Sequence, residues 1–227
     1  MRTTTGRLVL ASALLLLASA SARAACGHSP APGVDWSGCT KSRLVLKRSA
    51  LAGAKFDRAT LLGVDLSLAD LARTSFRSSE INHSSFSGAT LQGTSFEKAV
   101  VVRGNFSGAR FGNASLEKAT FHRADLSQAD LKGANLSQAD FGRSTFDGAD
   151  LGGASLRLSS VARASFVGAK LGGTDFTRAF TFAARFAGTD LSGVKGLTQE
   201  QLDVACGDAK TILPPGLKAP KDWPCED

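Results

Sequence analysis

A five-residue repeat runs through most of the chain and restricts its fold more than any other feature. Three consecutive copies occupy positions 124–128, 129–133 and 134–138, and a fourth begins at Ala139. We denote the central Leu or Phe of each copy as position i. In steps of five, position i occurs thirty times between residues 46 and 191, and every residue there is apolar except Thr181. From Ser49 to Thr189, position i−2 is Ala, Ser, Thr or Gly, apart from Val64.

A period of five matches neither a helix face nor an alternating β-strand. It does fit a short extended segment followed by a bend. Because residues two apart in an extended chain point to the same side, we expect i−2 and i to point inward together. The other three residues of each copy then face solvent or form the turn. A repeat of this regularity predicts a solenoid.

Glycine reveals a longer period of twenty residues. At position i+2, the columns that begin at Gly53 and Leu68 contain 11 glycines in 15 places. The columns that begin at Arg58 and Gly63 contain one glycine in 14. Four copies therefore form one coil with four sides. We expect glycine at i+2 to permit turns with positive φ.

The motif of a small residue, Asp or Asn, Leu or Phe, and two variable residues resembles the pentapeptide-repeat family. The resemblance covers residues 44–193. It implies an all-β solenoid, a right-handed four-sided parallel β-helix. The repeat count gives about seven coils, and at ~4.8 Å per coil the rod is roughly 35 Å long.

The twenty-residue period also places large side chains above one another. One inner column contains Phe56, Phe76 and Phe96, and another contains Phe86 and Phe106. We expect these rings to stack at an offset, which contributes ~0.5–1.5 kcal/mol per pair beyond area burial. A charge at such a position is expected to be strongly destabilising.

The first 24 residues are typical of a signal peptide. Arg2 and Arg7 precede an apolar segment at 8–20, and small residues at 18–24 offer cleavage sites. We therefore expect the mature protein in the periplasm or outside the cell, with no transmembrane segment. Lipid attachment at Cys26 is the less favoured alternative, because Arg23 stands where a lipidation motif has an aliphatic residue.

All four cysteines lie in the end segments, which we expect to cap the solenoid at 25–43 and 194–227. In an exported protein they are expected to form two disulfides. Local pairing, Cys26–Cys39 and Cys206–Cys225, is favoured over the other connectivities and over a zinc site.

The C-terminal segment contains the signals of a short capping helix. Thr198 is the expected N-cap and Gln201 completes a capping box. Leu197 and Leu202 form a hydrophobic staple, and Gly207 is the expected end. The alternative is that this segment docks a partner.

Two surface features are candidates for binding. Four arginines recur every twenty residues at i+2 and form an arginine ladder, Arg103, Arg123, Arg143 and Arg163. Such a ladder suits carboxylates or phosphates along an anionic partner, although a solvated face paired with nearby Asp residues is the simpler interpretation. The second feature is Phe180 and Phe182, which flank Thr181. They form an exposed apolar spot if the register holds; a bulge or contact with the cap would bury them.

No metal, phosphate-loop or nucleophile motif is present, so no cofactor and no enzymatic activity are expected. The recurring Asp residues at i−1 suit turns.

The favoured function is an exported, non-catalytic scaffold that binds a protein or anionic polymer of the bacterial cell envelope. One alternative is a DNA mimic, because the family includes proteins that protect DNA gyrase from quinolones. The net charge of +7 opposes it, and no nucleic-acid partner is expected. The second alternative, an enzyme acting on acidic polysaccharide, would use the column of Asp70, Asp130, Asp150 and Asp190.

Overall fold

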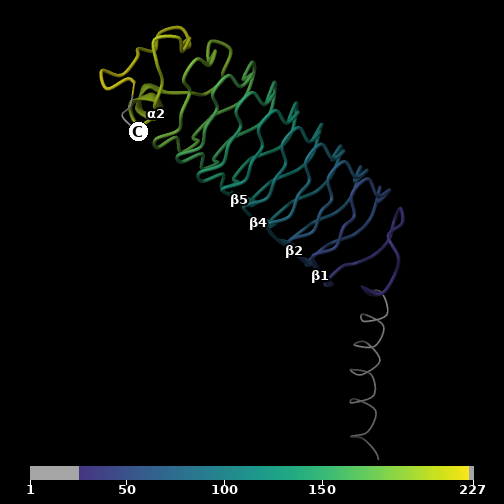
Figure 1. Cartoon of the computed structure of the whole chain (residues 1–227). Coiled ribbons are helices and arrows are strands. Elements are labelled where there is room, and N and C mark those ends of the chain that lie inside the picture. Colours follow the sequence, from purple (N-terminus) through teal and green to yellow (C-terminus); the bar gives the residue numbers. More distant parts are fainter. Residues whose placement is uncertain (1–25, 225–227) are drawn as a thin grey trace, which may run out of the picture.

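The computed structural model describes residues 26–224, which form a rod of stacked coils (Figure 1). The predicted parallel β-solenoid is confirmed. Parallel bridges connect residues twenty apart in eight successive steps, from Asp35–Lys55 to Asp175–Lys195. There is slightly more solenoid than the seven coils expected, because coil geometry already begins near Trp36, upstream of residue 44. The signal segment at 1–24 lies outside the described residues.

One face of the rod is a regular parallel sheet in the order β1-β2-β3-β4-β5. Each strand pairs with the strand twenty residues later, so the sheet spans about four turns. The strands are β1 Thr40–Ser42, β2 Thr60–Leu62, β3 Glu80–Asn82, β4 Val100–Val102 and β5 Thr120–His122. Beyond β5 the same face continues as isolated bridges, Thr120–Asp140, Asp140–Ser160 and Ser160–Phe180.

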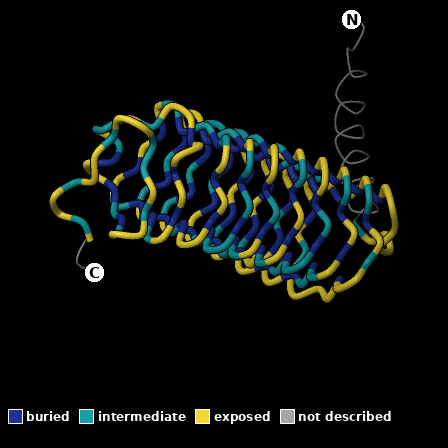
Figure 2. The backbone as a smooth tube through the Cα atoms, turned by 90° about the horizontal axis from the view of Figure 1, so that it is seen from above, coloured by how far each residue is buried: buried dark blue, intermediate teal, exposed yellow. Residues whose placement is uncertain are grey.

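The core is a continuous column of side chains from positions i and i−2, and exposed residues alternate with it along each coil (Figure 2). The predicted ring stacks are present. Phe86 and Phe106 stack with centroids 4.6 Å apart, and Phe56 stacks on Phe76 at 4.8 Å. Where Thr replaces Ala at i−2, its hydroxyl is satisfied inside the rod; Thr74 Oγ1, for example, donates to the Leu51 carbonyl at 3.0 Å. The interior is therefore closely packed, and these hydroxyls do not disrupt it.

Positive φ occurs at nearly every i+2 position, so the glycine pattern gives only part of the turn geometry. Arg103 has φ 54° and Arg143 has φ 60°, close to the 63° of Gly133. The backbone N–H at i+2 donates to a carbonyl of the next coil, as Arg143 does to Ala162 at 2.9 Å. These bonds impose the left-handed conformation on side chains that disfavour it by roughly 1–2 kcal/mol each.

Aspartate at i−1 stabilises the same turns. The Asp65 carboxylate accepts the Ser67 backbone N–H at 2.9 Å, and hydrogen bonds from Ser67 hold the pKa of that carboxyl below its usual value. The column proposed for catalysis forms the same bond, since Asp70, Asp130, Asp150 and Asp190 each accept the N–H two residues later. These carboxylates therefore stabilise turns.

The N-terminal end is closed by the predicted Cys26–Cys39 disulfide. Neither a lipid on Cys26 nor a zinc site at these two cysteines is compatible with that bond. Lys41 occupies position i in the first coil, where its ammonium lies 4.0 Å from the Trp36 ring centroid and donates to the Cys26 carbonyl. Position i is only partly buried in this first coil, so the ammonium of Lys41 is tolerated there.

At the other end, α2 (Gln199–Asp203) has the predicted capping box between Thr198 and Gln201. The predicted end at Gly207 is wrong, because the helix stops at Asp203 with Val204 as C-cap. Gly207 instead lies against Trp223, whose ring a Cβ at 207 would overlap at 2.2 Å. The helix also explains Thr181, the one polar residue at position i between residues 46 and 191, because its hydroxyl donates to the Gln201 carbonyl at 2.6 Å. Of the second predicted disulfide, Cys225 lies outside the described residues.

The stacked rings should dominate stability. We expect Phe106→Ala to lower the free energy of unfolding by about 3–5 kcal/mol, because it leaves a cavity in a fully buried column that cannot collapse. The exposed Val167→Ala is the matched control, with an expected loss below about 0.5 kcal/mol. Urea denaturation followed by circular dichroism measures both, and similar losses for the two variants would contradict a core-dominated rod.

Candidate functional site

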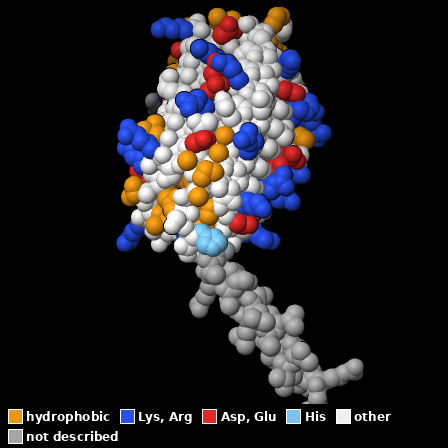
Figure 3. All heavy atoms as spheres, turned by 90° about the vertical axis from the view of Figure 1, so that its right-hand side faces the viewer, with side chains coloured by type: hydrophobic (Ala, Val, Ile, Leu, Met, Phe, Trp, Pro, Cys, Tyr) orange, Lys and Arg blue, Asp and Glu red, His pale blue; other side chains and the backbone are white. Residues whose placement is uncertain are grey.

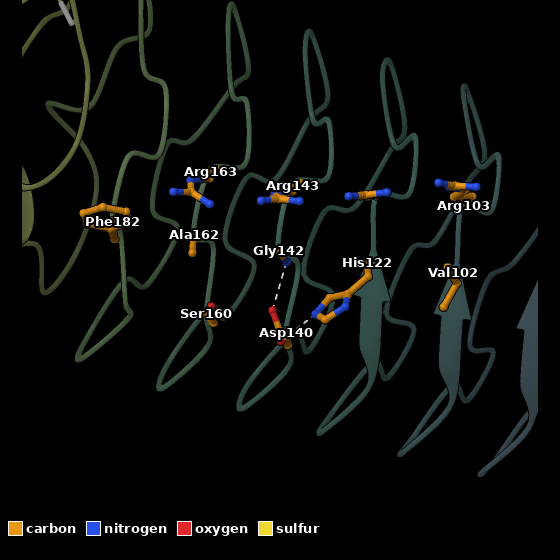
Figure 4. A pocket seen from close by; sticks show the side chains of 11 residues that line it. Val102, Arg103, His122, Asp140, Gly142, Arg143, Ser160, Ala162, Arg163 and Phe182 are labelled. Carbon is orange, nitrogen blue, oxygen red and sulfur yellow. Dashed lines mark hydrogen bonds and ion pairs between the residues drawn. The ribbon is translucent and has the colours of Figure 1, made fainter. Parts of the chain in front are cut away.

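An open groove of about 540 Å³ follows the rod axis on the face that continues from the sheet (Figure 4). The residues that line it come from five successive coils. They are Val102, Arg103, His122, Arg123, Asp140, Gly142, Arg143, Ser160, Ala162, Arg163 and Phe182. The whole arginine ladder and one of the two candidate phenylalanines are therefore brought into one site.

The groove is hollow because of the residues at position i+1 on this face. In the first coils this position carries Leu62, Asn82, Val102 and His122, and at the far end it carries Phe182. Between these it carries Gly142 and Ala162. These two small residues therefore lie between the larger side chains of His122 and Phe182, and the groove continues past His122 to Val102 (Figure 4).

The arginine ladder forms one wall. The guanidinium groups of Arg103, Arg143 and Arg163 lie in a row along the groove (Figure 4). Arg123, from the coil between Arg103 and Arg143, also lines the groove, and all four side chains are exposed. Within residues 26–224 none of these guanidinium groups forms an ion pair or a hydrogen bond, although Arg163 lies 5.7 Å from the Phe182 ring centroid. The pairing with nearby Asp residues in the simpler interpretation is thus absent from the described structure.

Two arginines elsewhere on the rod form ion pairs with carboxylates. Arg77 contacts Glu97 at 3.0 Å and Arg157 contacts Asp175 at 3.2 Å, each across one coil. In Figure 3, Lys and Arg side chains occupy both flanks of the rod with Asp and Glu side chains among them. The ladder differs because the neighbouring i−1 and i+1 positions on its face offer few carboxylates.

The opposite wall is built around His122 and Asp140. The Nε2 atom of His122 lies 2.7 Å from Asp140 Oδ2, and Asp140 Oδ1 accepts the Gly142 N–H at 2.9 Å (Figure 4). A Cβ at residue 142 would lie 3.4 Å from two atoms of the His122 ring and 3.2 Å from Asp140 Oδ1. Glycine at this position therefore leaves room for the pair. The Ser160 side chain completes this wall.

Phe180 and Phe182 are both exposed, at 56% and 44%. The register holds, since Thr181 between them is buried, and the alternative of a bulge or cap contact that buries them is wrong. Their rings stack on each other with centroids 6.3 Å apart. Phe182 lines the groove, whereas Phe180 does not.

Sequence reasoning identified the cationic and aromatic parts of this groove but missed the wall and floor. His122, Asp140, Gly142 and Ala162 were not selected, although all lie on the same face as the ladder. The signal that could have identified the floor is the column at i+1 on this face, in which Gly142 and Ala162 stand between the larger His122 and Phe182.

The groove contains no arrangement typical of a metal centre. Within the described range no three His, Cys, Asp or Glu side chains are close enough to hold a metal ion. In the same residues no helix is long and apolar enough to cross a membrane. The available chemistry is the binding of anions along one wall, hydrogen bonding along the other, and apolar contact at the Phe182 end.

The conformation of the ladder gives a stability test. We expect Arg143→Gly to be about 1 kcal/mol more stable than Arg143→Ala, because residue 143 has φ 60° and glycine adopts that conformation without strain. Both variants lose the same charge, so their difference isolates the backbone. Thermal and urea denaturation of the two proteins measure it. A glycine variant that is the less stable of the two would show that the turn is not strained.

The chain matches a known family over much of its length. The family model described as pentapeptide repeats matches in eight copies, over residues 45–80, 69–103, 105–143 and 139–178. A search of curated protein sequences found no match.

Three solved structures that are similar to this chain differ in sequence identity and coverage. HetL from the cyanobacterium Nostoc sp. strain PCC 7120, a protein involved in heterocyst differentiation regulation, is 23% identical, with a TM-score of 0.41 and coverage of 87% of this chain and 97% of its own. A pentapeptide repeat protein of the Arabidopsis thaliana thylakoid lumen is 35% identical over 45% of this chain and 68% of its own, with a TM-score of 0.36. Full-length QnrB1, a plasmid-mediated fluoroquinolone resistance protein, is 16% identical over 80% of this chain and 89% of its own, with a TM-score of 0.43.

Because these TM-scores are low, the assignment rests on the repeat itself. The family model covers more than half of the chain, and the described structure has the coil that the repeat predicts. The chain belongs to the pentapeptide-repeat family.

Proposed function

We propose that this chain is an exported, non-catalytic interaction module that binds an anionic partner of the cell envelope in the groove. The observation that supports the proposal is the ladder of four exposed arginines whose guanidinium groups have no carboxylate partner in residues 26–224. Hydrogen-bonding groups on the opposite wall and Phe182 at the end of the groove would restrict which anionic partners fit.

The electrostatics of the ladder favour an anion. Neighbouring arginines are separated by one coil, ~4.8 Å along the axis. Unit charges at about 4 Å repel by about 1 kcal/mol in water and by more near a low-dielectric surface. An anionic group between two guanidiniums replaces that repulsion with two charge-assisted hydrogen bonds, and Arg can form them in bidentate geometry. Binding of an anion would therefore reduce the electrostatic repulsion between neighbouring guanidinium groups.

Export is supported from two sides. The first 24 residues have the charge and hydropathy pattern of a signal peptide. The Cys26–Cys39 disulfide is a bond that forms and persists in oxidising compartments. Cleavage after Ala24 would leave 24 basic and 20 acidic residues, so the mature chain stays cationic.

The two alternative functions have less support. A DNA mimic must present a row of negative charges, whereas the groove presents a row of positive ones. An enzyme that cleaves acidic polysaccharide needs a free acid and base, whereas the column of Asp70, Asp130, Asp150 and Asp190 forms turns.

Export can be measured on the full sequence in a Gram-negative host. We expect intact-mass analysis of the periplasmic fraction to show an N-terminus at Ser21, Arg23 or Ala25, because small residues precede each of these positions. Leu15→Arg, which interrupts the apolar segment, should leave the precursor uncleaved in the cytoplasm. A wild-type chain found in the cytoplasm with its first residues intact would contradict export.

The binding role can be tested by photo-crosslinking in cells. A benzophenone side chain at Val102 lines the groove and leaves every arginine in place; the same group at Leu68, which is 48% exposed on another face, is the control. We expect an adduct from position 102 only, lost when Arg123→Gln and Arg143→Gln are combined. An adduct that survives the double substitution, or none from either position, would argue against an anionic partner in this groove.

A further inference from the structure

We infer that the groove binds an acidic polysaccharide, a linear polymer of uronic acids. This inference rests on the proposed function and identifies the chemical class of its anionic partner.

The shape favours a polymer over a small molecule. The groove is an open trough along the rod axis, with lining residues from five successive coils, residues 102 to 182. The four arginines that line it recur once per coil, every twenty residues. A small anion would contact one or two of them, whereas a linear chain with an anionic group on each unit can contact all four.

The wall opposite the ladder selects among anionic polymers. Asp140 presents a carboxylate 44% exposed, and the hydroxyl of Ser160 lies beside it on the next coil. A carboxylate repels a phosphate chain but accepts hydrogen bonds from hydroxyl groups. Polyphosphate has no such donors and DNA carries its hydroxyls only at its ends. The occupant should therefore present anions on one edge and hydroxyls on the other.

A uronic acid has this arrangement. The carboxylate at C5 lies on one edge of the pyranose ring, and the hydroxyls at C2 and C3 lie on the opposite edge. In the groove, carboxylates would meet the arginine ladder while hydroxyls meet Asp140, Ser160 and the His122 ring. The match follows from the two walls together, since neither wall alone distinguishes a sugar from another anion.

The end of the groove supplies an apolar platform. Phe182 faces the trough, and Phe180 stacks behind it at 6.3 Å. The C–H groups on a pyranose face pack against an aromatic ring, whereas a phosphate chain has no comparable surface. Arg163 lies 5.7 Å from the Phe182 centroid, so one sugar unit can contact both side chains.

The test compares three charge-matched probes on the purified mature protein: de-esterified oligogalacturonate, inorganic polyphosphate and single-stranded DNA. Isothermal titration at low ionic strength gives the affinities. We expect oligogalacturonate to bind tightest. Arg143→Gln should weaken it about tenfold, because a charge-assisted hydrogen bond is lost. Arg58→Gln is the matched control, an exposed arginine in the same left-handed turn position on a neighbouring face, and should change the affinity less than about twofold.

Two further variants separate sugar recognition from simple charge. Phe182→Ala should weaken oligogalacturonate about fivefold and polyphosphate much less. Asp140→Asn keeps an acceptor oxygen but removes the charge. It should lower the ratio of oligogalacturonate affinity to polyphosphate affinity about fivefold. Unchanged melting temperatures would show that the variants are folded.

The outcomes distinguish this inference from the proposed function. If all three probes bind equally and the selectivity variants have no effect, the groove is a general anion site and the polysaccharide inference is wrong. If no probe binds, the inference is also wrong, and crosslinking from Val102 decides separately whether the groove binds an anionic protein.

Discussion

The backbone hydrogen bonds between successive coils are the interaction on which the rest of the structure depends. Phe106, for example, donates its N–H to the Asp125 carbonyl at 2.7 Å, and Asp125 donates to Gly104 at 2.9 Å. Because these bonds recur along the chain, each residue lies next to the one twenty positions later. Inward-pointing and outward-pointing side chains therefore both recur at the same interval, one coil apart along the rod. Core residues determine whether the rod forms, while the outward residues at i−1, i+1 and i+2 form its surface.

The fold could be predicted from the sequence because its two periods determine which residues point inward and which residues lie above one another. The period of five places Leu and Phe on the axis, and the period of twenty stacks Phe86 on Phe106. The arginine ladder followed from the same arithmetic, as did the exposed phenylalanines once the register held. These features depend only on position within the coil.

Features that depend on contacts between different positions could not be predicted in this way. The groove floor requires comparing side-chain volumes along one column, where Gly142 and Ala162 follow His122. The left-handed conformation of Arg143 is imposed by bonds from neighbouring coils and opposes the preference of the residue itself. Lys41 at position i and the helix end at Asp203 depend on how the two ends of the rod are closed.

If the groove binds a polymer as proposed, the regular coil spacing also affects which polymers fit. The four guanidiniums project from consecutive coils of one rigid backbone, with no loop between them that could adjust their separation. A polymer whose charged groups recur at a different interval can align with one arginine but drifts out of phase with the next. The offset between the charged groups of the polymer and the arginines increases with each further unit. Selectivity should therefore grow with the number of coils engaged, even when a single contact discriminates poorly.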